Sequence, residues 1–364
     1  MSADQGPAPL RQPDLLPNNF DLLRLAAAAQ VMIVHLNDNF LHHESLVIRL
    51  LRQAPGVPIF FFISGYLISA SWERHPDLAA FARNRVLRIV PAYVAVTLFS
   101  LAGILLFAHL NLARDSGRLV LWFVAQFAFL SDWNPQFLRS YGTGVVNASL
   151  WTIPVEICFY VATPLLYLCL RRTRRTALFL GSVAAICFTV AYADLAFGTR
   201  LGRMVAEGIS LTPVPWFGMF VFGILAQRNR ERLLPLLRRR AAILGMLCLA
   251  LMILSAFWIW PPLIFSGSRF IGIANFTVLA LFLLAAAYAR PTLAIRLLRR
   301  NDISYGLYLV HLPVANMLLA NGVTGFGGAF WAGALSVPLA LLSWFVVEKP
   351  ALGRRRYALY PHGG

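Results

Sequence analysis

The residues best suited to chemistry lie inside strongly apolar segments. Arg24 and His35 stand eleven residues apart in the run FDLLRLAAAAQVMIVHLNDNF. Eleven residues return a helix to nearly the same face, about 16 Å further along its axis. Asp38 follows His35 by one turn, within hydrogen-bonding reach. The spacing leaves two interpretations open: a catalytic histidine with a cation on the same face, or a histidine satisfied by a neighbouring helix while Arg24 anchors the helix end.

A second apolar segment, SLWTIPVEICFYVATPLL, contains a carboxylate. Thr152, Glu156 and Tyr160 fall at i, i+4 and i+8 on one helical stripe. Pro154 is expected to loosen the helix beside them. A charged residue at the middle of a span costs about 2.5–3.5 kcal/mol on insertion scales, so it usually faces an interior cavity and has a function. Glu156 is therefore a candidate functional residue.

Two other apolar segments carry polar side chains at helical spacing. Ser304, Tyr308 and His311 share one face of NDISYGLYLVHLPV. Ser64 lies in PIFFFISGYLISASW, where it either packs or lines a site. Gly65 and the serine four residues later form a small-residue pair that lets helices approach closely, so packing is the better interpretation of Gly65.

Two arginines stand three residues apart in FARNRVLRIVPAY, at the start of another apolar segment. Arg85 and Arg88 therefore share a helix face, and paired guanidiniums suit bidentate contacts to phosphate. They also suit simple anchoring at the positive side of a membrane. On charge alone, anchoring is the simpler interpretation.

Composition indicates the element that must position these residues, a membrane helix. The 364-residue chain is 59% hydrophobic and only 13% charged, whereas soluble domains are about 25% charged. The net charge of +17 comes from arginines clustered between apolar runs, which indicates membrane topology and argues against a nucleic-acid partner. The four cysteines lie in apolar runs without metal-ligand spacing, so we expect buried thiols and no metal site.

The apolar runs predict an all-α, polytopic membrane bundle of about ten transmembrane helices. The candidate spans are 22–42, 55–73, 89–110, 149–170, 176–197, 212–227, 241–259, 269–290, 303–320 and 329–347. An eleventh run, 119–131, is too short to cross without strain. If it does not cross, every arginine-dense connection and both termini lie on the cytoplasmic side; if it crosses, most of them move outside. Arg49 and Arg52 are exceptions on the outer side.

The remaining segments suggest no soluble domain. We expect a disordered cytoplasmic segment over 1–19, a transmembrane domain over 20–350 and a basic cytoplasmic tail over 351–364. No cleavable signal peptide is apparent, because the first segment is polar and the first apolar run contains Arg24.

In chain order, these motifs resemble the acyltransferase-3 family of membrane acyltransferases. The resemblance covers residues of about 20–350 and rests on six fragments, none of which is specific by itself. They are Arg24 with His35, FFFISGYL (60–67), RNRVLRIVPAY (83–93), LWTIPVEICFY (150–160), ISYGLYLVH (303–311) and EKP (348–350). Pro154 departs from the family pattern and is expected to bend its helix. The extra periplasmic esterase-like domain of some members is absent from the sequence, so transfer to the acceptor would rest on the membrane domain.

The resemblance implies transfer of an acyl group, most often acetyl, from cytoplasmic acyl-CoA to a hydroxyl of a cell-envelope or exopolysaccharide sugar, in the cell inner membrane. The expected acyl-CoA contacts are Arg24, Arg85 and Arg88, and no metal is expected. His35 would be the general base. Its tautomer would be held by Glu156 or Asp38. Ser64, Tyr308 and His311 would line the path or stabilise the oxyanion.

Two other functions are compatible with the same residues. One is an acyltransferase acting on a small molecule or lipid. The other is a non-catalytic transporter or flippase for a lipid-linked glycan, with His35 and Glu156 relaying protons. The sequence motifs do not distinguish a glycan acceptor from a small-molecule or lipid acceptor, because the outer loops contain no motif that identifies a ligand.

Overall fold

The computed structural model describes residues 17–130, 133–173, 175–193, 212–258 and 269–355. Over these residues the fold is helical, with no strand. The α-helices are α1 (Phe20–Leu36), α2 (Leu46–Gln53), α3 (Gly56–Arg74), α4 (Leu78–Phe107), α5 (Leu112–Phe127), α6 (Thr152–Arg172), α7 (Thr176–Ala193), α9 (Val214–Arg228), α10 (Arg230–Leu237), α11 (Ala241–Trp258), α12 (Arg269–Ala289), α13 (Leu293–Leu298), α14 (Ser304–Ala320), α15 (Gly325–Ser343) and α16 (Lys349–Leu352).

Each of the ten apolar runs coincides with a helix where the structure describes it, residues 194–197 and 259 lying outside the described chain, but fewer qualify as spans by length and composition. Five helical stretches of the described chain are long and apolar enough to cross a membrane. They are Phe20–Leu41, Leu46–Arg74, Leu78–Phe107, Ala148–Arg172 and Gly325–Leu352. A sixth would be the pair Arg230–Leu237 and Ala241–Phe257, which is bent by 85°. The chain is thus a multi-pass membrane protein, and the crossing number of ten stays a prediction.

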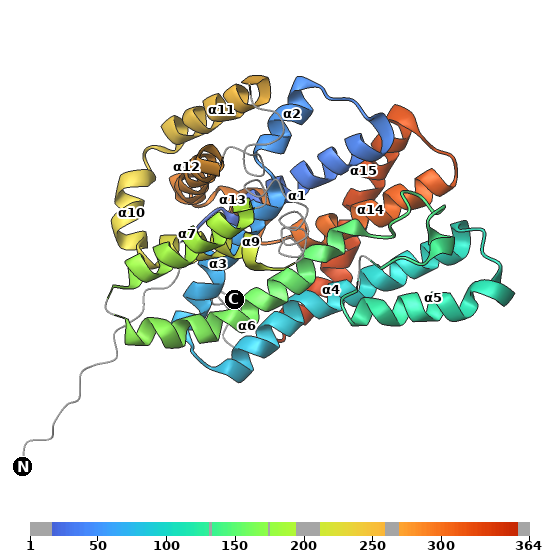
Figure 1. Ribbon diagram of the computed structural model, residues 1–364, viewed down its shortest axis with the longest axis horizontal. Helices are drawn as coiled ribbons and strands as arrows, with labels where there is room; N and C mark the ends of the chain where they lie inside the picture. The colour runs from blue at the N-terminus through green and yellow to red at the C-terminus, as the bar shows by residue number, and fades with distance from the viewer. Residues whose placement is uncertain (1–16, 131–132, 174, 194–211, 259–268, 356–364) are drawn as a thin grey trace, which may run out of the picture.

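The run 119–131 lies largely within α5, which has 16 residues and is not among the candidate spans of the described chain. Asn111 caps its N-terminus by accepting a hydrogen bond from the Arg114 N–H. The Tyr93 hydroxyl of α4 donates to the Gln126 carbonyl, 2.6 Å away, and so fixes α5 against its longer neighbour. The helix lies at the opposite end of the molecule from α10–α12 (Figure 1). Whether this segment crosses the membrane stays a prediction.

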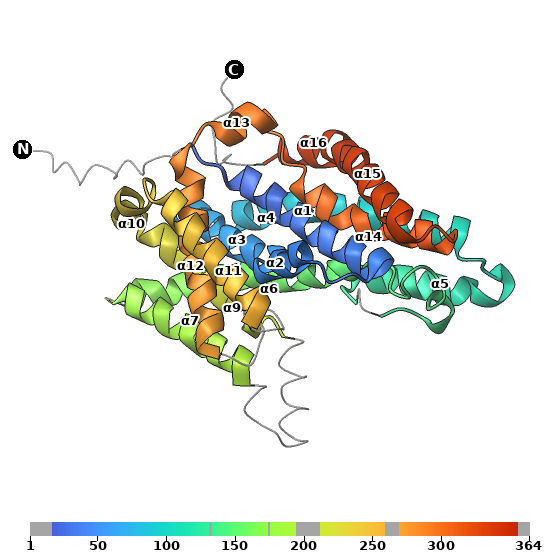
Figure 2. The same cartoon turned by 90° about the horizontal axis from the view of Figure 1, so that it is seen from above.

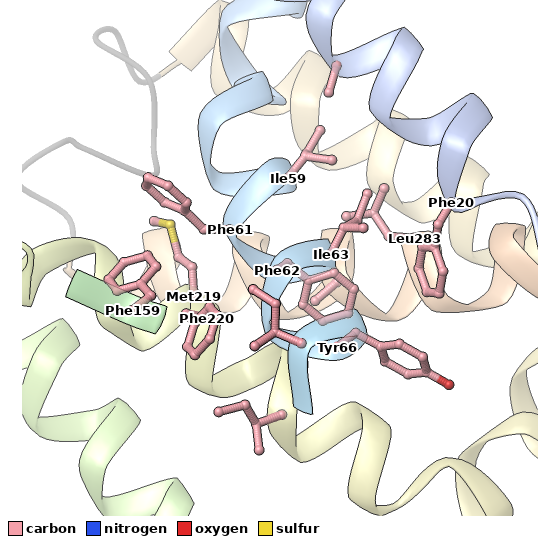
Figure 3. Packing of buried hydrophobic residues seen from close by; sticks show 14 of the residues in the cluster. Phe20, Ile59, Phe61, Phe62, Ile63, Tyr66, Phe159, Met219, Phe220 and Leu283 are labelled. Carbon is pink, nitrogen blue, oxygen red and sulfur yellow. The ribbon is translucent and has the colours of Figure 1, made fainter. Parts of the chain in front are cut away.

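The core is built around α3, which packs along α9 and against α1 and α6. Its aromatic side chains pack in both directions (Figure 3). Phe61 meets Phe159 of α6 edge-on, with ring centres 5.0 Å apart. Tyr66 lies 5.0 Å from Phe20 of α1 and donates to or accepts from the Tyr288 hydroxyl of α12. These contacts hold α1 in a fixed orientation beside α14, its other main neighbour (Figure 2).

Both predicted terminal segments need correction where the structure describes them. Asn19, assigned to the disordered segment, is 4% exposed. Its amide donates to the Arg290 carbonyl and accepts from the Ala294 N–H, so it ties the start of α1 to α12 and α13. The predicted tail, from 351, begins inside α16 and continues along α4 as far as Arg355. Residues 1–16 and 356–364 lie outside the described chain.

Pro154 does not bend a helix interior as expected. The helix α6 begins at Thr152, after the short 3-10 turn Ala148–Trp151, so Pro154 falls in its first turn. A first-turn residue needs no N–H for an intrahelical hydrogen bond, and the fixed φ of proline suits that position. The departure from the family pattern is therefore accommodated without loss of a helical hydrogen bond.

Candidate active site

Two histidines from distant parts of the chain meet between α1 and α14. The Nδ1 atom of His35 lies 2.9 Å from Nε2 of His311. The two rings are stacked at 28°, with centres 5.2 Å apart. His311 is fully buried, whereas His35 is half-buried. The pair is therefore a buried imidazole supporting a more accessible one.

The second ring nitrogen of His311 determines the tautomers of the pair. Its Nδ1 lies 3.1 Å from the Leu307 carbonyl, which can only accept, so Nδ1 carries the proton. In a neutral ring Nε2 is then an acceptor. Nδ1 of His35 must donate to it, which leaves Nε2 of His35 with a free lone pair. This arrangement is suited to removing a proton from a hydroxyl group.

Tyr308 fixes a loop beside the histidine pair. Its hydroxyl lies 3.0 Å from the Ser149 carbonyl and 3.1 Å from the hydroxyl of Thr152, at the start of α6. The Asn147 amide of the same loop donates to the Leu309 carbonyl at 2.9 Å. Three contacts thus hold this loop against the helix that carries His311.

Ser64 lies half-buried on α3, one turn after Phe60. The ring of Phe60 meets Tyr308 edge-on, with centres 5.6 Å apart. This contact brings the α3 face that carries Ser64 towards the Tyr308 region of α14.

The two carboxylates expected to orient His35 bind elsewhere. Asp38 lies in the π-helical turn Asn37–Leu41 and forms an ion pair with Arg52, which also reaches Glu44 at 2.9 Å. This ion pair explains the presence of Arg52 on the outer side, where the positive-inside rule does not predict arginine. Glu156 accepts a hydrogen bond from Tyr160, one turn further along α6. His311 of α14, the main neighbour of α1, therefore occupies the position predicted for Asp38 or Glu156.

At the other end of α1 and α14, a carboxylate that the sequence analysis missed joins two arginines. Asp302 lies 3.0 Å from Arg24 and 2.8 Å from Arg88, and its side chain is 7% exposed. Burial alone would raise the pKa of Asp302, but the two guanidiniums and the hydrogen bonds from Ser304 lower it below its usual range. Asp302 is the sole acidic residue between Glu231 and Glu348, and arginines are its neighbours in the sequence. This isolated position is the sequence feature from which Asp302 could have been identified as a functional residue.

Arg85 lies beside this pair without a carboxylate of its own. Its guanidinium carbon lies 5.6 Å from the ring centre of Phe81 and 5.5 Å from that of Tyr160. Arg88 is placed similarly over Tyr305, at 5.2 Å. Among the described residues, no Asp or Glu oxygen lies within 4.0 Å of the Arg85 guanidinium. We call Arg24, Arg85 and Arg88 with Asp302 the arginine site.

The arginine site and the histidine pair lie on the same helices but are separated. Arg24 and His35 are eleven residues apart on α1, or about 16 Å at 1.5 Å per residue. Ser304, which binds Asp302, precedes His311 on α14 by seven residues, or about 10 Å. Within the described chain, no three His, Cys, Asp or Glu side chains are grouped closely enough to hold a metal ion. A cluster of arginines and a histidine pair thus lie at two levels of one bundle.

The comparisons with known proteins identify the family. A family model described as an acyltransferase domain (Acyl_transf_3) matches residues 18–348. The chain belongs to the acyltransferase-3 family. This acyltransferase is 34% identical to nodulation protein 10 of Rhizobium leguminosarum bv. viciae, over 93% of this chain and 94% of that protein.

More distant relatives carry names that state an activity. The chain is 25% identical to the peptidoglycan O-acetyltransferase OatA of Listeria monocytogenes, over 82% of this chain and 49% of that protein. It is also 25% identical to an O-acetyl transferase of Shigella phage Sf6, over 93% and 96% of the two chains. No solved structure matches this acyltransferase.

Proposed function

We propose that this acyltransferase moves an acetyl group from cytoplasmic acetyl-CoA to a hydroxyl of a cell-envelope or exopolysaccharide sugar. The observation that carries the proposal is the 2.9 Å contact between Nδ1 of His35 and Nε2 of His311, from which we infer that Nε2 of His35 is available to accept a proton. Relatives named as O-acetyltransferases, one of them acting on peptidoglycan, support an O-linked product and a carbohydrate acceptor.

In the proposed reaction, Nε2 of His35 removes the proton from the acceptor hydroxyl as its oxygen attacks the thioester carbonyl. His311 accepts the Nδ1–H hydrogen bond and so stabilises the imidazolium that forms. The tetrahedral oxyanion then collapses and expels the thiolate of coenzyme A. The thiolate takes the proton back from His35, which leaves an ester, a free thiol and the enzyme in its starting state. We assign to Ser64 the donation of a hydrogen bond to the oxyanion.

The arginine site is assigned to the phosphates of the donor. Arg24 pairs with Asp21 and Asp302, and Arg88 with Asp302 and Glu348, whereas Arg85 has no carboxylate at ion-pair distance among the described residues and can take a phosphate. Arginine forks bind phosphate oxygens bidentately. In coenzyme A a long pantetheine arm separates the phosphates from the thioester. That separation suits a phosphate site and a proton acceptor at different levels of one bundle.

The orientation of the protein is part of the proposal. With both termini in the cytoplasm, the arginine site faces the compartment that contains acyl-CoA, and His35 lies towards the other side. This orientation rests on the arginine-dense connections of the sequence and on the positive-inside rule.

The test is acetyl transfer by the purified protein in lipid nanodiscs, with radiolabelled acetyl-CoA and candidate glycans. We expect transfer by the wild type and a loss of about 10²-fold or more in His35→Ala, since general bases contribute about 10²–10⁴-fold. His43→Ala is the matched control, because His43 is exposed near the same end of α1. Retention of more than about a tenth of the activity by His35→Ala would reject the role of base.

The acceptor is tested separately, by mass spectrometry of surface glycans from strains with and without the gene. An added mass of one acetyl group per sugar supports the proposal. Acetylation of a small molecule or lipid instead would replace the carbohydrate acceptor. Complete inertness towards acetyl-CoA with every acceptor would favour a transporter.

A further inference from the structure

The chain does not leave the bundle after its last long helix but turns back along α4. The π-helical turn Trp344–Glu348 and the short helix α16 follow α15, and α16 packs against α4. Arg83 of α4 then donates a hydrogen bond to the Arg354 carbonyl at 3.0 Å. This bond fixes the tail two residues after Leu352, and the next side chain, Arg355, is half-buried.

The Arg355 side chain lies among the arginines of the arginine site. It is close enough to Arg85, Arg88 and Arg24 for their charges to act on it. Its Nε atom is buried and has no hydrogen-bond partner in the described chain. The Nε atoms of Arg24 and Arg85 are also buried and have no hydrogen-bond partner in the described chain. Three buried guanidinium N–H groups in one region thus lack an acceptor.

Placing the Arg355 guanidinium as a fourth cation beside the arginine site is electrostatically unfavourable without an anion. Burial first, and then the charges of Arg85 and Arg88, lower the pKa of Arg355 to about 9, so the side chain remains positive at neutral pH. The carboxylates at ion-pair distance all belong to Arg24 and Arg88: Asp302 is shared by both, Asp21 pairs with Arg24, and Glu348 lies 3.9 Å from Arg88. Within the described residues, neither Arg85 nor Arg355 has a carboxylate at ion-pair distance. Buried donors and charges of this kind are normally paired, so their combination indicates a binding site for a polyanion.

We propose that Arg355 is a fourth phosphate-binding guanidinium of this acyltransferase, brought to the donor by the tail that Arg83 fixes to α4. The proposal rests on the proposed function, in which the donor is acyl-CoA. It adds a residue that lies beyond the segment 18–348 matched by the family. It also gives the tail a role in donor binding.

The experiment compares Arg355→Ala with Arg354→Ala in the full-length protein in nanodiscs. Arg354 is the matched control, because its exposed side chain carries the same charge on the adjacent residue. Two donors are used with each variant: acetyl-CoA, and S-acetylpantetheine, which has the thioester arm without phosphates. Arg355→Lys, which keeps the charge and loses the fork, is the conservative variant.

We expect Arg355→Ala to raise the KM for acetyl-CoA about tenfold, the size of one charge-assisted hydrogen bond, with kcat within about twofold. Arg355→Lys should fall between the wild type and Arg355→Ala, and Arg354→Ala should match the wild type. With S-acetylpantetheine, Arg355→Ala should behave as the wild type does, because no phosphate is present to be lost.

Two results would overturn the proposal while leaving the proposed function intact. One is an equal KM for acetyl-CoA in Arg355→Ala and Arg354→Ala. The other is an equal rise in KM with both donors, which would show a structural effect of the substitution. A wild-type protein that uses neither donor would instead reject acyl-CoA as the donor, and with it the assignment of Arg355.

Discussion

Nδ1 of His35 and Nε2 of His311 lie 2.9 Å apart although 276 residues separate them in the chain. Nδ1 of His311 donates to the Leu307 carbonyl. In the hydrogen bond between the two rings, Nδ1 of His35 is therefore the donor and Nε2 of His311 the acceptor. The pair resembles a histidine and its orienting acid in a catalytic triad, but a neutral imidazole replaces the carboxylate. A neutral partner avoids an uncompensated negative charge inside the bundle.

The first prediction concerns His311, which we assign as a positioning residue for His35. His311→Ala removes the acceptor for the Nδ1–H group, so the wrong tautomer of His35 becomes populated. We expect kcat for acetyl transfer to fall about 10²-fold with little change in the KM for acetyl-CoA. His311→Gln, whose carbonyl oxygen can accept the same hydrogen bond, should recover part of the loss. Equal kcat values in His311→Gln and His311→Ala would contradict the positioning role.

The second prediction concerns Asp302, which joins Arg24 to Arg88. Asp302→Asn leaves two buried guanidiniums without their shared carboxylate, and we expect a loss of about 3 kcal/mol of stability at pH 7. Thermal unfolding in detergent measures the difference from the wild type.

The pH dependence of that difference follows from the direction of the pKa shift. The pKa of Asp302 is lower in the folded protein than in the unfolded chain, because Arg24 and Arg88 outweigh the effect of burial. Its contribution is therefore complete above the unfolded value of about 3.9 and is lost as the pH falls through the folded value. The wild type should keep its advantage over Asp302→Asn at pH 5.5 and lose it only in stronger acid. An advantage that disappears between pH 7 and 5.5 would contradict the ion pair.

The third prediction separates two neighbouring arginines. Arg88→Ala breaks contacts to Asp302 at 2.8 Å and Glu348 at 3.9 Å, so it should lower stability as well as donor affinity. Arg85→Ala removes a guanidinium that lies over two aromatic rings and, within the described chain, pairs with no carboxylate, so stability should change by about 1 kcal/mol or less. We still expect Arg85→Ala to raise the KM for acetyl-CoA about tenfold. An unchanged KM would exclude Arg85 from the phosphate site.

The sequence predicted the helices well because membrane helices leave a strong local signal. The apolar runs each became a helix, and the face shared by Arg24 and His35 follows from helical periodicity alone. Run 119–131 was separated from the spans by its length; the structure has the 16-residue helix α5 there, and its not crossing stays a prediction. Such predictions need only information within about twenty residues.

The partners of the candidate residues could not be predicted in the same way. Periodicity places His35 on a face of α1 but does not say which helix that face meets, so Asp38 and Glu156 were considered before His311. Arg355 lay in a segment expected to be a plain basic tail. Its position depends on the turn after α15 and on a backbone hydrogen bond from Arg83, neither of which has a sequence pattern.

The last prediction concerns Gly65, where the sequence indicated close packing of helices and the structure agrees. A Cβ atom on Gly65 would lie 2.0 Å from the Phe220 carbonyl oxygen, and one on Gly223 would lie 2.1 Å from that of Phe62. The two glycines thus let α3 and α9 approach backbone to backbone, and a carbonyl cannot move aside as a flexible side chain can. We expect Gly65→Ala to cost about 1–3 kcal/mol of stability.

A displaced α3 would also move Ser64, so kcat should fall in Gly65→Ala even at temperatures where the protein remains folded. Gly181→Ala is the control, because a Cβ atom at that position of α7 meets nothing within 4 Å. It should be neutral or slightly stabilising, since alanine is the better helix former. Thermal unfolding and acetyl transfer are measured on both variants to compare their stability and activity. Equal behaviour of the two would show that α3 and α9 do not depend on this contact.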